Sequence, residues 1–397
     1  MIITLERKMK QVRLRPLMAV AFLNETAYSM MWPLATIYLN TILHKSLTVA
    51  GMALFCFSVA NVIGSVVLGK LYDKFNQFKL TITGMALCVL ICALGIWFDG
   101  WPAYPIILTA FGFTSGWLTT AVNVYGTLIP GKSTTKVFNE VYLVLNVGLV
   151  VGTMAISEIF HRSIAPIFLL ATGIYGLSLV VLLLYFPRQR VDYLNHAVTR
   201  IDVERKTNIG STSRLFALSF LSLVVMWMMY SQWESNFSVY LIDIGFPLRV
   251  YSILWAVNGV VIIIVQGLLS RFPNMIKSLF NRVNIGLFFL AISYFVTVVS
   301  HNVVYIYLGM ILLTIGEAIY VPSVPVIIDN WSPAAVKGRN QGLVGGFSSV
   351  GRALGPVFGG MVIDHSSFRV LFIIAGIAMV VITIMNYWNN LQFKEVK

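Results

Sequence analysis

Residues 164–186 read IAPIFLLATGIYGLSLVVLLLYF, and PRQRVDYLNHAVTRIDVERK follows at 187–206. The first stretch holds no charged residue and is long enough to cross the hydrocarbon core of a bilayer, which needs about 20 mostly apolar residues. The second stretch is polar and charged and lies near the middle of the 397-residue chain. Together they predict a membrane-spanning helix followed by a central loop in water.

Eleven further apolar runs of comparable length flank these two stretches. Six of the runs, counting 164–186, precede the central loop, and six follow it. The twelve runs lie at 15–39, 47–69, 80–98, 103–128, 137–160, 164–186, 215–241, 250–270, 283–300, 303–329, 340–363 and 369–388. They predict twelve transmembrane helices.

The expected fold class is therefore an all-α integral membrane protein with twelve transmembrane helices in two six-helix halves. We expect an N-terminal half at 1–187, a cytoplasmic linker at 188–213 and a C-terminal half at 214–397. The composition agrees, because 58% of the residues are hydrophobic and 11% are charged, against about 45–50% and about 25% in a soluble domain. So little charge excludes a soluble enzyme, a nucleic-acid-binding protein and a disordered chain.

The positions of the basic residues predict the orientation in the membrane, because cytoplasmic loops carry the excess of Lys and Arg. With the N-terminus inside, the external segments hold only Lys45, Arg162, Arg249 and Arg369, and Arg352 lies inside a run. The rest of the 28 Lys and Arg residues fall in cytoplasmic segments. We expect a multi-pass protein of a bacterial cell membrane with both termini in the cytoplasm.

No residue cluster suggests a cofactor. The three cysteines, Cys56, Cys88 and Cys92, all lie in apolar runs and fit small core residues better than a disulfide framework or a zinc site. The chain has no phosphate-binding Gly-Lys loop. We therefore expect no metal, no cofactor, no nucleic-acid partner and no enzymatic activity.

The two predicted halves look like a diverged duplication. Gly116 and Gly316 lie at matching depths of the fourth and tenth runs. The segment GKLYDKF at 69–75, after the second run, has a weak counterpart in GLLSRF at 267–272, after the eighth. Parallel six-helix repeats with a solute site between them near the bilayer midplane describe a secondary transporter.

Three short motifs resemble a known transporter family. GKLYDKFNQFK at 69–79 resembles the loop 2–3 signature of the major facilitator superfamily, with Asn76 in place of a second glycine. GEAIYVPSV at 316–324 resembles a helix 10 stretch of LmrP-type multidrug exporters in the drug:proton antiporter family. RALGPVFGG at 352–360 is similar to a helix 11 pattern of the wider superfamily. The resemblance implies the major facilitator fold and proton-coupled export of drug-like compounds.

Three acidic residues, Glu25, Glu234 and Glu317, lie well away from the ends of their apolar runs. An ionised group at the bilayer centre costs about 2.5–3.5 kcal/mol on insertion scales. Burial disfavours the charged form of a carboxyl group, so a buried Glu can take up and release a proton near neutral pH. We expect Glu317, near the midplane, to be the main proton-binding residue. Glu25 could bind a second proton or a cationic solute, or only pair with polar neighbours. Glu234 could line the outer part of a substrate cavity or belong to a wet helix end.

Arg352 is the one cation far from the ends of a predicted helix, so it needs a carboxylate or carbonyl partner. Glu317 is one possible partner, and the sequence leaves open whether the two residues pair. The superfamily resemblance implies a gating charge network that includes Gly69, Asp73, Lys74 and Arg352. The alternatives are a helix-ending charge in a wet loop and a fixed structural pair.

Six aromatic residues fall near the middle of the first, fourth, seventh and tenth runs, which line the cavity in the family: Tyr28, Trp32, Trp117, Tyr125, Trp227 and Tyr320. Aromatic faces attract organic cations, so these side chains together with buried carboxylates would suit flat lipophilic cations. Helix packing is the alternative role for each of them.

We therefore expect a monomeric, proton-coupled secondary transporter that exports hydrophobic or cationic drug-like compounds by alternating access. Its partners are protons, a small-molecule substrate and the lipid bilayer. The 137–160 run lacks the Gly-Pro motif that antiporters often carry, which leaves the direction of coupling open. The alternatives are a carrier of one specific solute, such as a sugar, peptide, metabolite or lipid, and a non-transporting membrane sensor.

Overall fold

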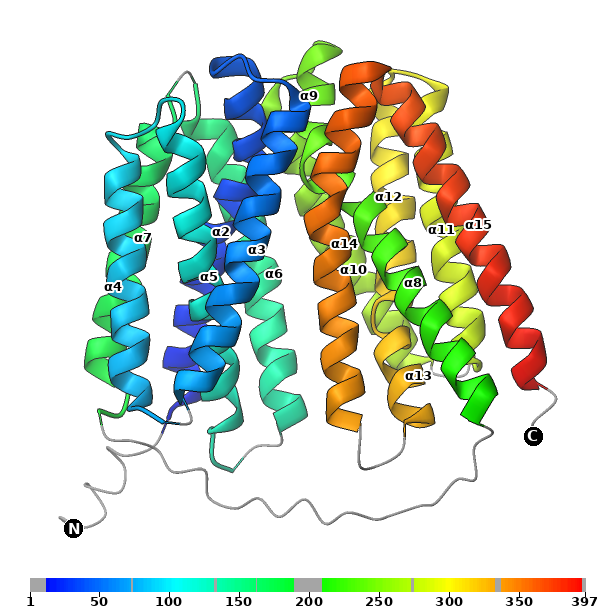
Figure 1. Ribbon diagram of the computed structural model, residues 1–397, viewed down its shortest axis with the longest axis horizontal. Coiled ribbons are helices and arrows are strands. Elements are labelled where there is room, and N and C mark those ends of the chain that lie inside the picture. Colours follow the sequence, from blue (N-terminus) through cyan, green and yellow to red (C-terminus); the bar gives the residue numbers. More distant parts are fainter. Residues whose placement is uncertain are drawn as a thin grey trace. The chain divides into compact units, whose positions relative to one another are not determined.

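The described part of the chain is helical, with no strand, and forms two compact units at residues 1–197 and 198–397 (Figure 1). The computed structural model describes residues 12–72, 74–131, 134–161, 163–188, 209–272, 275–332 and 337–394. Most of the linker expected at 188–213 lies outside these ranges, so its boundaries stay a prediction.

The first unit contains seven helical elements in its described residues. They are α2 (Leu14–Ile37), η1 (Tyr38–Ile42), α3 (Leu47–Tyr72), α4 (Gln77–Gly95), α5 (Ala103–Thr127), α6 (Thr134–Ile159) and α7 (Ala165–Tyr185). The π-helical turn η1 continues α2 without a loop, so α2 and η1 together correspond to the first apolar run.

The second unit contains eight helices in its described residues. They are α8 (Ile209–Glu234), α9 (Asn236–Asp243), α10 (Leu248–Arg271), α11 (Leu279–Val299), α12 (Val303–Tyr320), α13 (Ser323–Trp331), α14 (Lys337–His365) and α15 (Phe368–Lys394). The helix pairs α8–α9 and α12–α13 each correspond to one apolar run. Each of the twelve predicted runs is therefore a helix or such a pair.

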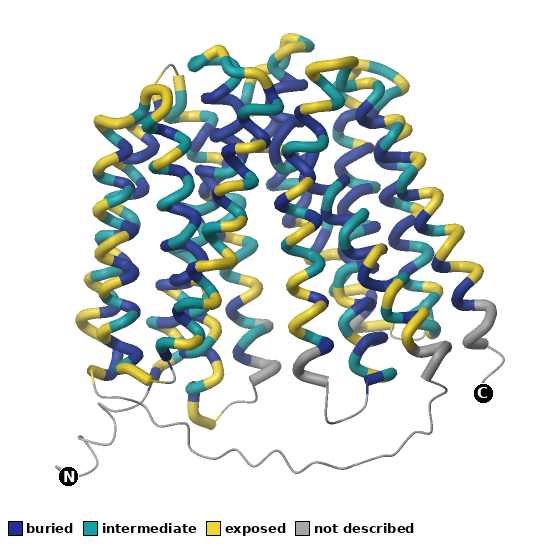
Figure 2. Tube along the Cα trace, in the orientation of Figure 1, coloured by how far each residue is buried: buried dark blue, intermediate teal, exposed yellow. Residues whose placement is uncertain are grey.

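Ten of these helical stretches are long and apolar enough to cross a membrane, by length and composition, within the described residues. The helices α2 and α14 are not among the ten, although they have 24 and 29 residues. Both are diluted by polar or small residues, such as Asn24 and Glu25 in α2 and the many glycines of α14. Along α4 and α15, exposed positions alternate with buried ones (Figure 2), and large apolar side chains such as Leu90 and Ile384 are exposed.

A row of glycines on α14 lets this helix pack closely against α8 in the second unit. A Cβ atom on Gly351 would lie 2.5 Å from the Val224 carbonyl oxygen, and one on Gly355 would lie 2.5 Å from the Met228 carbonyl oxygen. Small residues that recur every four positions allow such close backbone approach between membrane helices. The glycine stripe of α14 therefore has a close-packing role.

The first unit repeats this arrangement between α6 and α2. A Cβ atom on Gly148 would lie 2.8 Å from the Phe22 carbonyl oxygen, and one on Gly152 would meet the Thr26 carbonyl group. In each unit, the helix of the fifth apolar run (α6 or α14) therefore packs through glycines on the helix of the first run (α2 or α8). This shared contact agrees with the duplication that the sequence indicates.

We predict that Gly355→Ala destabilises the protein whereas Gly346→Ala, on the same helix, does not. Both changes bring the gain in helix propensity of about 0.5–1 kcal/mol that Ala has over Gly. A Cβ atom on Gly346 would meet nothing within 4 Å, whereas one on Gly355 would press on the backbone of α8, and overpacking costs about 1–3 kcal/mol. Thermal unfolding of the purified protein in detergent measures the difference, and equal midpoints for the two variants would contradict the close packing.

Candidate functional site

The helix break between α12 and α13 follows from Pro322. Proline has no backbone N–H, so the carbonyl oxygen four residues earlier, on Ala318, loses its helical donor. Gln266 on α10 supplies a replacement, because its Nε2 atom donates to the Ala318 carbonyl oxygen at 2.7 Å. This bond fastens α10 to α12 one residue after Glu317.

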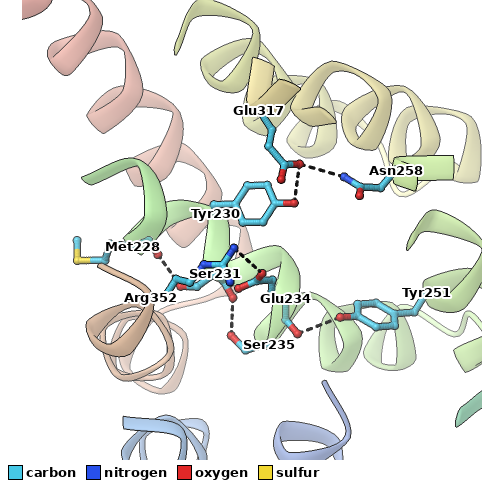
Figure 3. Close-up of polar contacts among 9 residues, drawn as sticks. All are labelled: Met228, Tyr230, Ser231, Glu234, Ser235, Tyr251, Asn258, Glu317 and Arg352. Atoms are coloured by element: carbon cyan, nitrogen blue, oxygen red, sulfur yellow. Dashed lines mark hydrogen bonds and ion pairs between the residues drawn. The ribbon is translucent and has the colours of Figure 1, made fainter. Parts of the chain in front are cut away.

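Glu317 receives hydrogen bonds from two neighbouring helices (Figure 3). The Tyr230 hydroxyl on α8 donates to Oε2 of Glu317 at 2.8 Å, and Nδ2 of Asn258 on α10 donates to the same oxygen at 3.1 Å. Nδ2 of Asn258 also donates to Oγ1 of Thr314 at 3.0 Å, one turn before Glu317 on α12. Glu317 is the central residue of the 29-residue span Val303–Trp331. A single carboxyl group therefore joins three helices at mid-span.

Arg352 on α14 forms an ion pair with Glu234 at the end of α8, with 3.6 Å between Nη2 and Oε1. The guanidinium also covers the indole of Trp227, with its Cζ atom 3.8 Å from the ring centroid. The sequence left Glu317 open as a partner for Arg352, and within the described residues Arg352 pairs with Glu234. The Tyr251 hydroxyl on α10 donates to the Glu234 carbonyl oxygen at 2.9 Å, which fixes the end of α8.

Tyr230 connects Glu317 to Trp227, the indole that Arg352 covers. Its ring packs edge-on against Trp227, with 5.2 Å between centroids, while its hydroxyl reaches Glu317. In the view of Figure 3, the Tyr230 side chain lies between Glu317 and the Arg352–Glu234 pair. The second unit thus brings together Glu317, Glu234, Arg352 and Trp227, which the sequence selected separately.

Two more of the predicted cavity residues are packed inside the first unit. The Trp117 side chain is 7% exposed, contacts Leu68 and Tyr72, and donates its indole N–H to the Leu80 carbonyl oxygen at 3.1 Å. Tyr125 is buried and packs edge-on against Tyr72 and Phe186. These contacts favour a packing role for both residues.

The remaining aromatic candidates differ in burial. Tyr320 on α12 is fully buried, and its hydroxyl lies 2.6 Å from Oγ of Ser222 on α8, which favours packing again. Tyr28 and Trp32 on α2 are half-buried and pack against Phe57, with ring centroids 5.9 and 5.3 Å apart. Tyr28 and Trp32 are thus partly accessible.

Comparison with known proteins decides the family. The profile of the Major Facilitator Superfamily matches residues 17–283 and 282–391. YttB of Bacillus subtilis (strain 168), described as an uncharacterized MFS-type transporter, is 33% identical over 354 residues, or 88% of each chain. The chain belongs to the Major Facilitator Superfamily. It is therefore a multi-pass membrane protein of a transporter family.

More distant relatives of this facilitator include a drug-resistance protein. Multidrug resistance protein 2 of Bacillus subtilis (strain 168) is 23% identical over 86% of each chain. The crystal structure of the POT family transporter PepTSo has a TM-score of 0.77 at 12% identity, and the match covers 97% of this chain and 98% of that one. The latter likeness shows the fold alone, and it confirms the expected major facilitator architecture.

Glu25 lies in the first unit of the facilitator and is half-buried on α2. Its Cβ atom lies at the contact with α6, where a Cβ on Gly148 would be 3.0 Å away. The neighbouring Asn24 accepts a hydrogen bond from the Ser178 hydroxyl on α7 at 3.2 Å. Glu25 therefore belongs to the interface of α2 and α6 in its own unit, and its role stays a prediction.

The loop 2–3 signature is described in part. Gly69 lies near the end of α3 with open space around its Cβ position, and Lys74 is exposed in the following turn. Asp73 lies outside the described residues. Asn76, which stands where the family has a second glycine, is the N-cap of α4, and its side chain accepts a hydrogen bond from the Lys79 backbone N–H at 3.1 Å. An N-capping role explains this departure, because Asn is among the best N-cap residues.

Sequence reasoning missed Asn258, Gln266 and Thr314. The signal was present for two of them, since Asn258 and Gln266 are isolated amides in the otherwise apolar run 250–270. No group of three His, Cys, Asp or Glu side chains that could hold a metal occurs among the described residues.

We predict that Gln266 and Pro322 are energetically coupled. Gln266→Met should leave the buried Ala318 carbonyl oxygen without a donor, which costs about 1–3 kcal/mol. Pro322→Ala restores a backbone N–H for that oxygen, so Gln266→Met should be much less harmful in the Pro322→Ala background. A double-mutant cycle on thermal unfolding in detergent measures this coupling. Additive effects of the two changes would contradict the idea that Gln266 replaces the backbone N–H that Pro322 lacks.

Proposed function

We propose that this chain is a proton-coupled exporter of hydrophobic cations that works by alternating access of its two units. The observation that carries the proposal is Glu317, an acidic side chain at mid-span held by two neutral donors, Tyr230 and Asn258. A carboxyl group in hydrocarbon is costly and marks a functional site by default. Tyr230 and Asn258 are uncharged, so they donate hydrogen bonds to Oε2 of Glu317 without adding a fixed positive charge. This suits a carboxyl group that changes charge in each cycle.

The coupling would work through the charge of Glu317. Protonation makes the carboxyl group neutral and removes its attraction for a cation, whereas loss of the proton restores that attraction. A proton and a cationic substrate thus compete for one group, which exchanges them across the membrane. An exchange that moves a net charge gains about 2.3 kcal/mol per charge for each 100 mV of membrane potential. Glu25, on the other unit, is the candidate for a second proton.

The substrate class rests on aromatic and acidic side chains together. Trp227 and Tyr230 lie beside Glu234 and Glu317 in the second unit, and Tyr28 and Trp32 follow Glu25 on α2 in the first. Aromatic faces attract organic cations. The likeness to Multidrug resistance protein 2 supports export of drug-like compounds. We further propose that the exporter is a monomer in a bacterial cell membrane with both termini in the cytoplasm, in line with its Bacillus relatives and its basic loops.

The test is transport of ethidium by proteoliposomes under an imposed proton gradient. We predict that Glu317→Gln abolishes gradient-driven movement, because Gln copies the neutral carboxyl group but cannot release a proton. The matched control is Glu158→Gln, the same chemical change at an exposed position of α6, which should transport as the wild type does. Purified Glu317→Gln should keep the monodisperse elution and the thermal unfolding midpoint of the wild type in detergent, which shows that this variant is folded.

Normal gradient-driven transport by Glu317→Gln would overturn the role of this residue. Wild-type protein that moves one solute and ignores organic cations would be a specific-solute carrier. Wild-type protein that binds a ligand without moving it would be a sensor. A panel that includes ethidium, a sugar and a dipeptide separates these outcomes.

A further inference from the structure

The guanidinium of Arg352 is bound as a ligand would be. Its Cζ atom lies 3.8 Å from the Trp227 ring centroid, and its Nη2 atom lies 3.6 Å from the Glu234 carboxylate. A planar delocalised cation is thus stacked on an aromatic face and paired with a carboxylate. The same two contacts are those by which proteins recognise organic cations.

Trp227 and Glu234 form this site from a single helix. They are seven residues apart on α8, which is about two turns, so they share one face of the helix. The arginine comes from a different helix, α14. Gly351 brings α14 so close that a Cβ atom there would lie 2.9 Å from the Trp227 Cβ atom, and Arg352 is the next residue. The close contact between α14 and α8 therefore places Arg352 against Trp227 and Glu234, which both lie on α8.

Burial differs between the site and its occupant. The Trp227 residue is 7% exposed and the Glu234 side chain 17%, whereas the Arg352 side chain is 43% exposed. Trp227 and Glu234 are thus held in place by packing, and the Arg352 guanidinium is the accessible part of the site. An accessible occupant can leave without breaking buried packing. Tyr230, edge-on to Trp227 and hydrogen-bonded to Glu317, connects the site to the carboxyl group proposed for proton coupling.

We propose that Trp227 and Glu234 form a binding site for delocalised organic cations and that Arg352 occupies this site until a substrate cation displaces it. The substrate class rests on the proposed function, and the site and its internal competitor go beyond it. The substrate cation takes over both contacts of the guanidinium, the ring face and the carboxylate. Arg352 thereby sets the affinity of the site, because every substrate must compete with it.

The test is equilibrium binding of ethidium to the purified protein in detergent. Removal of the competitor by Arg352→Gln should tighten ethidium binding by about tenfold, the scale of one cation–π and carboxylate contact. The matched control is Arg352→Lys, which keeps a cation but loses the planar guanidinium that stacks on Trp227. Its ethidium affinity should lie between those of the wild type and Arg352→Gln. In the Arg352→Gln background, Trp227→Leu or Glu234→Gln should remove the gain.

A second measurement uses the wild-type protein and so does not depend on a variant that folds. Phenylglyoxal modifies accessible guanidinium groups, and mass spectrometry quantifies its reaction at Arg352. Saturating ethidium should increase modification of Arg352, because the displaced side chain is free of Trp227. Unchanged or decreased modification, or unchanged ethidium affinity in a folded Arg352→Gln protein, would overturn the proposal. Neither assay contains a proton gradient, so failure here leaves coupling through Glu317 standing, and failure of coupling leaves this site standing.

Discussion

The structure of this facilitator depends on the demand that every backbone carbonyl at membrane depth finds a donor. Hydrocarbon offers no water, so a carbonyl freed by a helix break must be satisfied by a side chain nearby. The second unit meets this demand at its breaks with long polar side chains from neighbouring helices. Gln266 reaches the Ala318 carbonyl, and Tyr251 reaches the Glu234 carbonyl. These same bonds hold the ends of the segments that carry Glu317 and Glu234.

Close helix contacts and the charged groups are parts of one arrangement. The glycine stripe of α14 brings its backbone against α8, and Gln232 on α8 then reaches the Gly355 carbonyl oxygen at 2.8 Å, one residue before Pro356. Arg352 lies between Gly351 and Gly355 on α14, two of the glycines that bring this helix against α8. The packing of the two helices therefore decides which acidic residue the arginine meets. Glu234 is on α8 itself, whereas Glu317 is on α12 and accepts hydrogen bonds from Tyr230 of α8 and Asn258 of α10.

The sequence was informative about elements and weak about contacts. Long apolar runs predicted the helices because the bilayer sets their length, and the rarity of charge in such runs singled out Glu317, Glu234 and Arg352. Aromatic residues at mid-run were less informative, because Trp117 packs in a hydrophobic cluster whereas Trp227 meets a guanidinium. Composition does not distinguish these roles. The partner of Arg352 depends on the rotation of two helices about their axes, which single-sequence patterns leave undetermined.

The hydrogen bonds around Asn258 have a fixed direction. The Thr314 hydroxyl donates to the Met310 carbonyl oxygen at 2.7 Å, so toward Asn258 it acts as an acceptor. The amide nitrogen of Asn258 must therefore face Thr314, and it gives its other hydrogen to Glu317. An amide held in this way has no proton to pass on and no vacancy to receive one. A proton on Glu317 therefore has no onward path through Asn258 and Thr314, so this side of the cluster holds a proton rather than conducting it. In the proposed cycle, a proton that enters Glu317 cannot leave through α10, and exposure of this carboxyl group to one side of the membrane at a time would keep transport coupled.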